Sequence, residues 1–120
     1  AYLIDGDGLR QVTSDHSLVA EMVRRGELSA MEARHHPNKN VITRALGVEQ
    51  SVSCDVFPLT PGKGQFVLLC SDGLTNEVSE PEIYYEVFQS QEPEKACDTL
   101  IDIAKDRGGR DNITVLLASF

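Results

Sequence analysis

Apolar and polar residues follow one another along the chain in a pattern that predicts both strands and helices. Residues 1–4 and 9–13 are strand-like and flank Asp5-Gly6-Asp7-Gly8, and Asp-Gly between two such runs predicts a β-hairpin. Residues 65–70 are almost continuously apolar, which predicts a strand buried on both faces. Residues 52–59 alternate loosely, and residues 112–120 are rich in β-forming residues, so each segment is expected to add a strand.

Four further segments have the spacing of amphipathic helices. Residues 17–25 place apolar side chains four positions apart and end before Gly26. Ser29 and Ser79 each precede a glutamate by three residues, a capping box that predicts a helix start. The fourth helix is expected to begin at Pro93. The order of strands, helix pair, strands, helix pair and strand predicts an α+β fold with mostly antiparallel pairing.

Composition narrows the classes of function. The chain has 120 residues, 41% of them hydrophobic, and a net charge of −8, so it is expected to form one domain or part of one and not to bind nucleic acid. It contains no apolar run of the roughly 18 residues that a membrane span needs, so no membrane partner is expected. Three cysteines without CxxC spacing argue against a disulfide or zinc framework and favour the cytoplasm.

Several tempting motifs fail on spacing. Asp5-Gly6-Asp7-Gly8 resembles the start of a calcium loop, but Leu9 follows and glycine stands at the wrong offset. Cys70 is followed six residues later by Asn76, where a cysteine phosphatase needs arginine. His35 and His36 have no partners at metal-ligand spacing.

Two aspartates at the ends of apolar runs remain. Asp72 follows the run at 66–71 and precedes Gly73, which permits a sharp turn, and Asp111 precedes the run at 113–117. If these strands pair antiparallel, both carboxylates lie at one rim of the sheet. Such oxygens suit Mg²⁺ or Mn²⁺, and two such ions can activate water for phosphoryl transfer. Spacing alone favours the plainer interpretation, in which each aspartate is a turn or strand-end cap.

The segments around these aspartates resemble two signature blocks of the metal-dependent protein phosphatases (PPM, or type 2C, serine/threonine phosphatases). The blocks read Cys70-Ser71-Asp72-Gly73-Leu74-Thr75 and Gly108-Gly109-Arg110-Asp111-Asn112-Ile113-Thr114-Val115. The segment Thr13-Ser14-Asp15-His16-Ser17 and the stretch from His36-Pro37 to Thr43-Arg44-Ala45-Leu46-Gly47 are similar to further family blocks. The resemblance therefore extends over the whole chain in order.

The resemblance implies a fold and a chemistry. The expected fold is the C-terminal part of a β-sandwich of antiparallel sheets flanked by helices, with a centre for two Mn²⁺ or Mg²⁺ ions. Asp72 and Asp111 would be metal ligands, supported by Gly73 and Asn112, and the chain would carry no other catalytic residue. Metal-activated water would attack phosphoserine or phosphothreonine in proteins directly, without a phospho-enzyme.

The resemblance also implies partners and a substrate flap. The partners would be phosphoprotein substrates of a serine/threonine kinase in the cytoplasm. Residues 17–47 would form a helical flap segment that brings His36, Asn38 and Arg44 near the substrate, although an ordinary solvated loop accounts equally well for residues 35–40.

Earlier blocks of the family are missing from this sequence. They include a D-G-h-G-G block with the aspartate that bridges both metals, an arginine for phosphate, and a G-D-S-R block. We therefore expect residues 1–120 to be the C-terminal portion of one phosphatase domain, inactive by itself and with an incomplete metal centre. Exposed sheet edges would favour a homodimer. The alternative, from another functional class, is a non-catalytic module that binds or regulates a partner.

Overall fold

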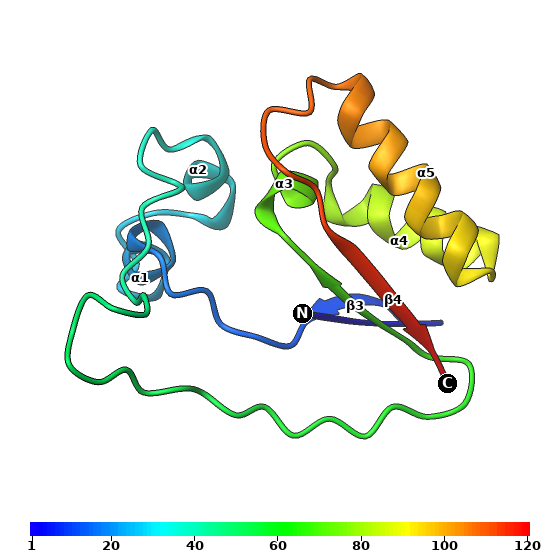
Figure 1. Ribbon diagram of the computed structural model, residues 1–120, viewed down its shortest axis with the longest axis horizontal. Helices are drawn as coiled ribbons and strands as arrows, with labels where there is room; N and C mark the ends of the chain where they lie inside the picture. The colour runs from blue at the N-terminus through cyan, green and yellow to red at the C-terminus, as the bar shows by residue number, and fades with distance from the viewer. The chain divides into compact units, whose positions relative to one another are not determined.

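The computed structural model describes residues 1–120, which divide into two compact units (Figure 1). One unit comprises Ala1–Thr13 and Pro58–Phe120, and the other comprises Ser14–Phe57. The first contains all four strands and three helices. In chain order its elements are β1 (Tyr2–Asp5), β2 (Gly8–Gln11), β3 (Phe66–Cys70), α3 (Asp72–Thr75), α4 (Glu80–Ser90), α5 (Pro93–Asp106) and β4 (Val115–Ser119).

The strands form one antiparallel sheet in the order β2-β1-β3-β4. The predicted hairpin is confirmed, since β1 pairs with β2 and the Asp5 side chain accepts a hydrogen bond from the Asp7 amide (3.0 Å). Gly8 takes the positive φ of 138° that the turn requires. β3 and β4 pair from Phe66 with Ser119 to Cys70 with Val115, so the end of β3 lies beside the start of β4, as antiparallel pairing predicts.

Helices α4 and α5 pack on one face of this sheet (Figure 1). In the core between the sheet and the helices, alternate residues of the strands pack against one apolar face of each helix. Its fully buried members include Ile4, Leu68, Leu74, Val78, Ile83, Val87 and Leu100. Both helices begin as predicted, α4 after Ser79 and α5 at Pro93, and the α+β class is confirmed.

One strand prediction is wrong in part, and another is wrong altogether. β3 is buried on one face only, because the Leu69 side chain, which points away from the helices, is 47% exposed. An apolar run shows that a strand is hydrophobic on both faces, but it cannot show that both are covered. Residues 52–59 form no strand, since this segment has no neighbouring strand with which to form backbone hydrogen bonds.

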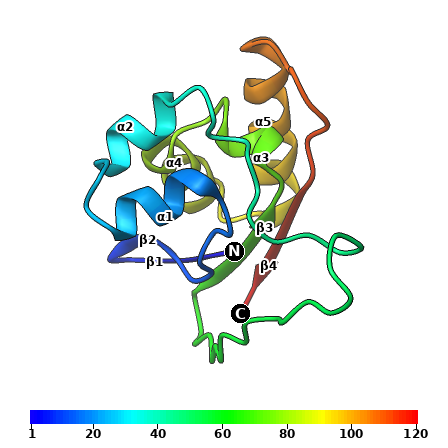
Figure 2. The same ribbon diagram turned by 90° about the vertical axis from the view of Figure 1, so that its left-hand side faces the viewer.

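The second unit contains α1 (Leu18–Arg24) and α2 (Ala30–His35), which contact each other (Figure 2). Ser17 caps α1 by accepting a hydrogen bond from the Ala20 amide (3.2 Å), and Ser29 and Glu32 form the predicted capping box of α2. Val19 is the one buried hydrophobic residue of this unit. No helix in the chain combines the length and apolar character that crossing a bilayer requires.

Candidate functional site

The two candidate aspartates stand on segments that the structure joins directly. Beyond the last β3–β4 pair, the Ser71 amide donates to the Thr114 carbonyl (3.0 Å), which extends the ladder by one residue. β3 then turns into α3, whose first residue is Asp72. On the partner segment, Asp111 lies three residues before Thr114, in the loop between α5 and β4. The predicted meeting of the two segments at one rim is confirmed.

Gly73 marks the closest approach between these segments. It is buried, and a methyl group built on its Cα would overlap the carbonyl oxygen of Asn112 and lie 3.4 Å from the Ile113 Cα. Its φ is not positive. Glycine is therefore needed here because the Asn112 backbone occupies the space of a side chain, and not because of the sharp turn that the sequence suggested.

The carboxylates of Asp72 and Asp111 are both exposed to solvent. Asp111 Oδ1 accepts a hydrogen bond from the Asn112 amide (2.7 Å), whereas the Asp72 side chain does not cap α3 or any other helix. Asn112 acts through its backbone, because its amide bonds Asp111 and its carbonyl accepts from Ser71 Oγ (3.2 Å). The structure therefore does not support the helix-capping role that the sequence left open for Asp72.

The donor set fits a hard divalent cation in part. Carboxylate oxygens at a rigid strand end are the ligands that Mg²⁺ and Mn²⁺ prefer, and the Gly73–Asn112 contact fixes the backbone beside both aspartates. No group of three or more histidine, cysteine, aspartate or glutamate side chains is assembled to hold a metal. Two carboxylates fill only part of an octahedral shell.

The predicted flap residues lie in the second unit and do not form one cluster. His36 ends α2, and its Nδ1 accepts a hydrogen bond from the Asn38 amide (3.1 Å), so these two residues share one local turn. Arg44 has other partners, because its Nη1 donates to the Ser53 carbonyl (3.0 Å) and to Asp55 Oδ1 (3.2 Å).

A polar cluster in this unit centres on Asp55, a residue that no motif marked. Asp55 Oδ2 lies 2.6 Å from His16 Nε2, and Oδ1 accepts from Arg44. The hydrogen bond to His16, followed by that to Arg44, lowers the pKa of the Asp55 carboxyl. His16 and Arg44 belong to two motifs far apart in the sequence. Only the tertiary structure shows that both contact Asp55.

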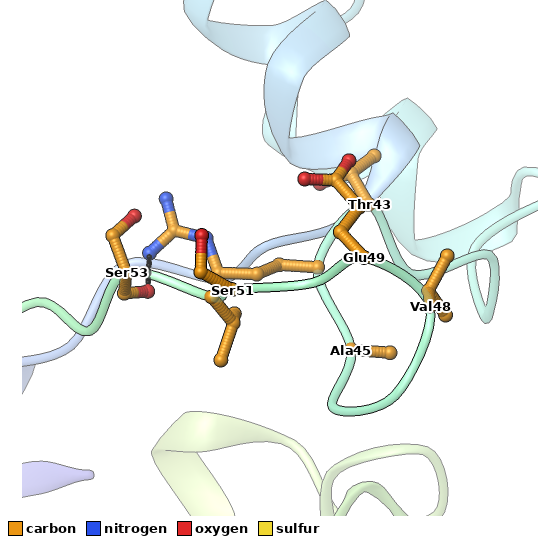
Figure 3. A pocket seen from close by; sticks show the side chains of 8 residues that line it. Thr43, Ala45, Val48, Glu49, Ser51 and Ser53 are labelled. Carbon is orange, nitrogen blue, oxygen red and sulfur yellow. Dashed lines mark hydrogen bonds between the residues drawn. The ribbon is translucent and has the colours of Figure 1, made fainter.

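An open pocket lies beside this cluster (Figure 3). The loop that carries Thr43, Ala45, Val48 and Glu49 curves round it, and Ser51 and Ser53 follow on the next segment. The wall therefore offers hydroxyl groups, short apolar side chains and one carboxylate. Arg44 lines the same pocket, so one of the three predicted flap residues has a concave surface beside it.

Comparison with known proteins identifies the family, although no family model matches the chain. The serine/threonine phosphatase stp of Listeria innocua is 50% identical over 116 residues, which are 97% of this chain and 46% of that protein. The PPM Ser-Thr phosphatase MsPP of Mycobacterium smegmatis, solved with cacodylate, matches with a TM-score of 0.89 and 39% identity over 99% of this chain and 51% of its own.

A third match is the catalytic domain of the serine/threonine protein phosphatase PstP, solved with two manganese ions. It has a TM-score of 0.77 and 33% identity, and the match covers 98% of this chain and 48% of that one. This chain therefore belongs to the bacterial PPM serine/threonine phosphatases. It spans about half the length of the relatives it matches.

Proposed function

We propose that this chain supplies part of the metal centre of a protein serine/threonine phosphatase, with Asp72 and Asp111 as ligands of Mn²⁺ or Mg²⁺. The observation that carries the proposal is the direct contact of the two aspartate-bearing segments, with Gly73 against the Asn112 carbonyl. The solved relative with two manganese ions supports the choice of metal. None of the comparisons favours the non-catalytic alternative.

In this proposal the bound ions supply an activated water for attack on the phosphorus of a phosphoserine or phosphothreonine. Asp72 and Asp111 hold the ions at the rim of the sheet, and both are exposed, so a phosphorylated segment of a protein can reach them. No side chain of the chain is needed as a nucleophile. Asn76, at the position where a cysteine phosphatase loop requires arginine, agrees with this mechanism.

The finer parts of the proposal concern partners. The substrates are phosphoproteins made by a serine/threonine kinase, the enzyme acts in the cytoplasm, and His36, Asn38 and Arg44 belong to a flap segment at residues 17–47 that borders the substrate. The 120-residue chain by itself is proposed to be inactive and to self-associate through its sheet.

The test is hydrolysis of a phosphothreonine peptide by the complete enzyme, with and without Mn²⁺. Asp72→Asn keeps the size of the side chain but removes the charge, and it should lower the metal-dependent rate by at least about 100-fold, since ligand loss removes several kcal/mol of charge stabilisation. Asp102→Asn, an exposed carboxylate in the middle of α5, is the matched control and should retain the wild-type rate. Full activity of Asp72→Asn would refute the ligand assignment.

A further inference from the structure

Ser71 occupies the position before α3 but does not behave as a helix cap. Its backbone is extended (φ −81°, ψ 166°), as at an N-cap, yet its side chain makes no capping hydrogen bond. A serine at this position ordinarily accepts a hydrogen bond from an amide of the first helical turn. The hydroxyl therefore has a role other than helix capping.

The hydroxyl stands in for a backbone carbonyl that the strand has lost. In a regular antiparallel ladder Thr114 would donate to the carbonyl of Ser71, but that carbonyl accepts instead from the Leu74 amide (3.1 Å), where the chain turns into α3. The Thr114 amide donates to Ser71 Oγ (3.0 Å). The ladder thus continues for one more residue while the backbone already bends towards Asp72.

The same hydroxyl reaches the loop that carries Asp111. Ser71 Oγ donates its proton to the Asn112 carbonyl (3.2 Å), the oxygen that lies against Gly73. The Ser71 side chain therefore accepts a hydrogen bond from the Thr114 amide and donates one to the Asn112 carbonyl. Ser71 also directly precedes Asp72 in the sequence.

We propose that Ser71 is a positioning residue of the candidate metal centre, whose hydroxyl fixes the Asp111 loop relative to Asp72 so that one ion can bind both carboxylates. The inference rests on the proposed function, because it concerns the same two aspartates. Ser71 touches neither the metal nor the substrate in this scheme, and it acts through the backbone of residues 112–114.

The chain contains a matched control for a purely structural effect. Ser90, at the end of α4, also uses its hydroxyl as donor and acceptor, donating to the Glu92 carbonyl (2.8 Å) and accepting from the Glu92 amide (3.2 Å), although both bonds are local. Its hydroxyl joins α4 to the start of α5 and carries no candidate ligand. Ser71→Ala and Ser90→Ala therefore each remove one donated and one accepted hydrogen bond of a serine hydroxyl, and only the first removes them beside the aspartates.

The experiment is a titration of the metal-free, ¹⁵N-labelled complete enzyme with MnCl₂, followed by the broadening of the Gly73 and Asn112 amide resonances. In the wild type both amides should broaden at the same Mn²⁺ concentration, since one ion contacts both segments. Ser71→Ala should raise the midpoint concentration by about tenfold, the lower end of the loss seen when supporting residues of metal sites are removed. Ser71→Thr, which keeps the hydroxyl, should restore the wild-type midpoint, and Ser90→Ala should not change it.

The outcomes separate this inference from the proposed function. Equal midpoints for Ser71→Ala and the wild type would overturn the positioning role and leave the ligand assignment intact, as would a Ser71→Thr midpoint as high as that of Ser71→Ala. A shift of the same size in Ser90→Ala would also overturn it, because the effect would then be general stability. Absence of broadening in the wild type would overturn the ligand assignment itself, and the inference with it.

Discussion

At the scale of single residues, the site depends on atoms that residue type alone does not reveal. Asp72 and Asp111 could be chosen from the sequence because each ends or precedes an apolar run. Gly73 was also singled out, but for the wrong physical reason, since it is the neighbouring Asn112 carbonyl that excludes a side chain. Ser71 could not be found, because its role exists only when Thr114 and Asn112 lie beside it.

Gly73→Ala tests this close packing. The added methyl group would overlap the Asn112 carbonyl, so the Asp111 loop must move, and we expect a loss of about 1–3 kcal/mol in the free energy of unfolding, as overpacking typically costs. The Mn²⁺ midpoint of the previous experiment should rise as well. Urea unfolding measures the first effect. Gly6→Ala is the control, because a methyl group there meets no atom within 4 Å, and a wild-type stability for Gly73→Ala would contradict the contact.

At the scale of elements, one arginine links α4 to α5, the helix that directly precedes the Asp111 loop. Arg107 ends α5, and its Nη2 and Nη1 bind the Glu82 carboxylate (2.6 and 3.0 Å) while Nη1 also donates to the Glu77 carbonyl (2.9 Å). Glu82 in turn accepts from the Ser79 amide (2.9 Å). The capping box predicted the start of α4, but the sequence did not indicate that Glu82 binds Arg107, 25 residues away at the end of α5.

Glu82→Gln tests this tie through its pH dependence. The Arg107 hydrogen bonds, followed by those from Ser79, hold the pKa of the Glu82 carboxyl far below its ordinary value of 4.5. A lowered pKa in the folded state gives stability that is fully present above about pH 4.5 and is lost as the pH falls towards the folded-state pKa. The free energy of unfolding of the wild type should therefore exceed that of Glu82→Gln by about 1 kcal/mol at pH 7. The difference is small because solvent screens an exposed ion pair.

The difference in stability between the two proteins should begin to shrink as the pH falls below 4.5 and should keep shrinking towards the folded-state pKa, because protonated Glu82 resembles glutamine. Thermal unfolding followed from pH 7 to pH 3 provides the measurement. Glu92→Gln is the control. Glu92 is the N-cap residue of α5 and forms an exposed ion pair with Lys95 (2.8 Å), so the loss of this pair should lower the free energy of unfolding by less than Glu82→Gln does. A stability difference that did not shrink in acid would show that Glu82 acts by packing and not by charge.

At the scale of the whole molecule, the helices cover one face of the sheet, whereas the opposite face buries Leu3 of β1 but is open on β3 and β4. The helices cover the face of Tyr2, Phe66 and Leu68, whereas Leu69 and Leu116 on the opposite face are 47% and 55% exposed. β4, an edge strand, contains no charged residue, and a neutral apolar edge beside an open apolar face favours association.

Leu116→Lys therefore tests the proposed self-association. Sedimentation velocity of the 120-residue chain should show a concentration-dependent dimer, and a lysine on the open face should shift it towards the monomer, because a buried charge without a partner opposes the interface. Tyr85→Lys, a substitution of an exposed residue (59%) on α4, should leave the dimer unchanged. A wild-type chain that stays monomeric at every concentration would contradict the proposal.

The sequence by itself determined the elements whose cause is local. Hairpin, capping boxes and helix starts depend on residues within four positions of one another, and the family resemblance depends on short blocks read in order. Only the tertiary structure decided which faces are covered, which carboxylate His16 and Arg44 share, and how Ser71 bridges the loop of Asp111. The hydrogen bonds of His16 to Asp55 and of Ser71 to Thr114 join residues 39 and 43 positions apart, and chain order does not specify such distant contacts until the backbone has folded.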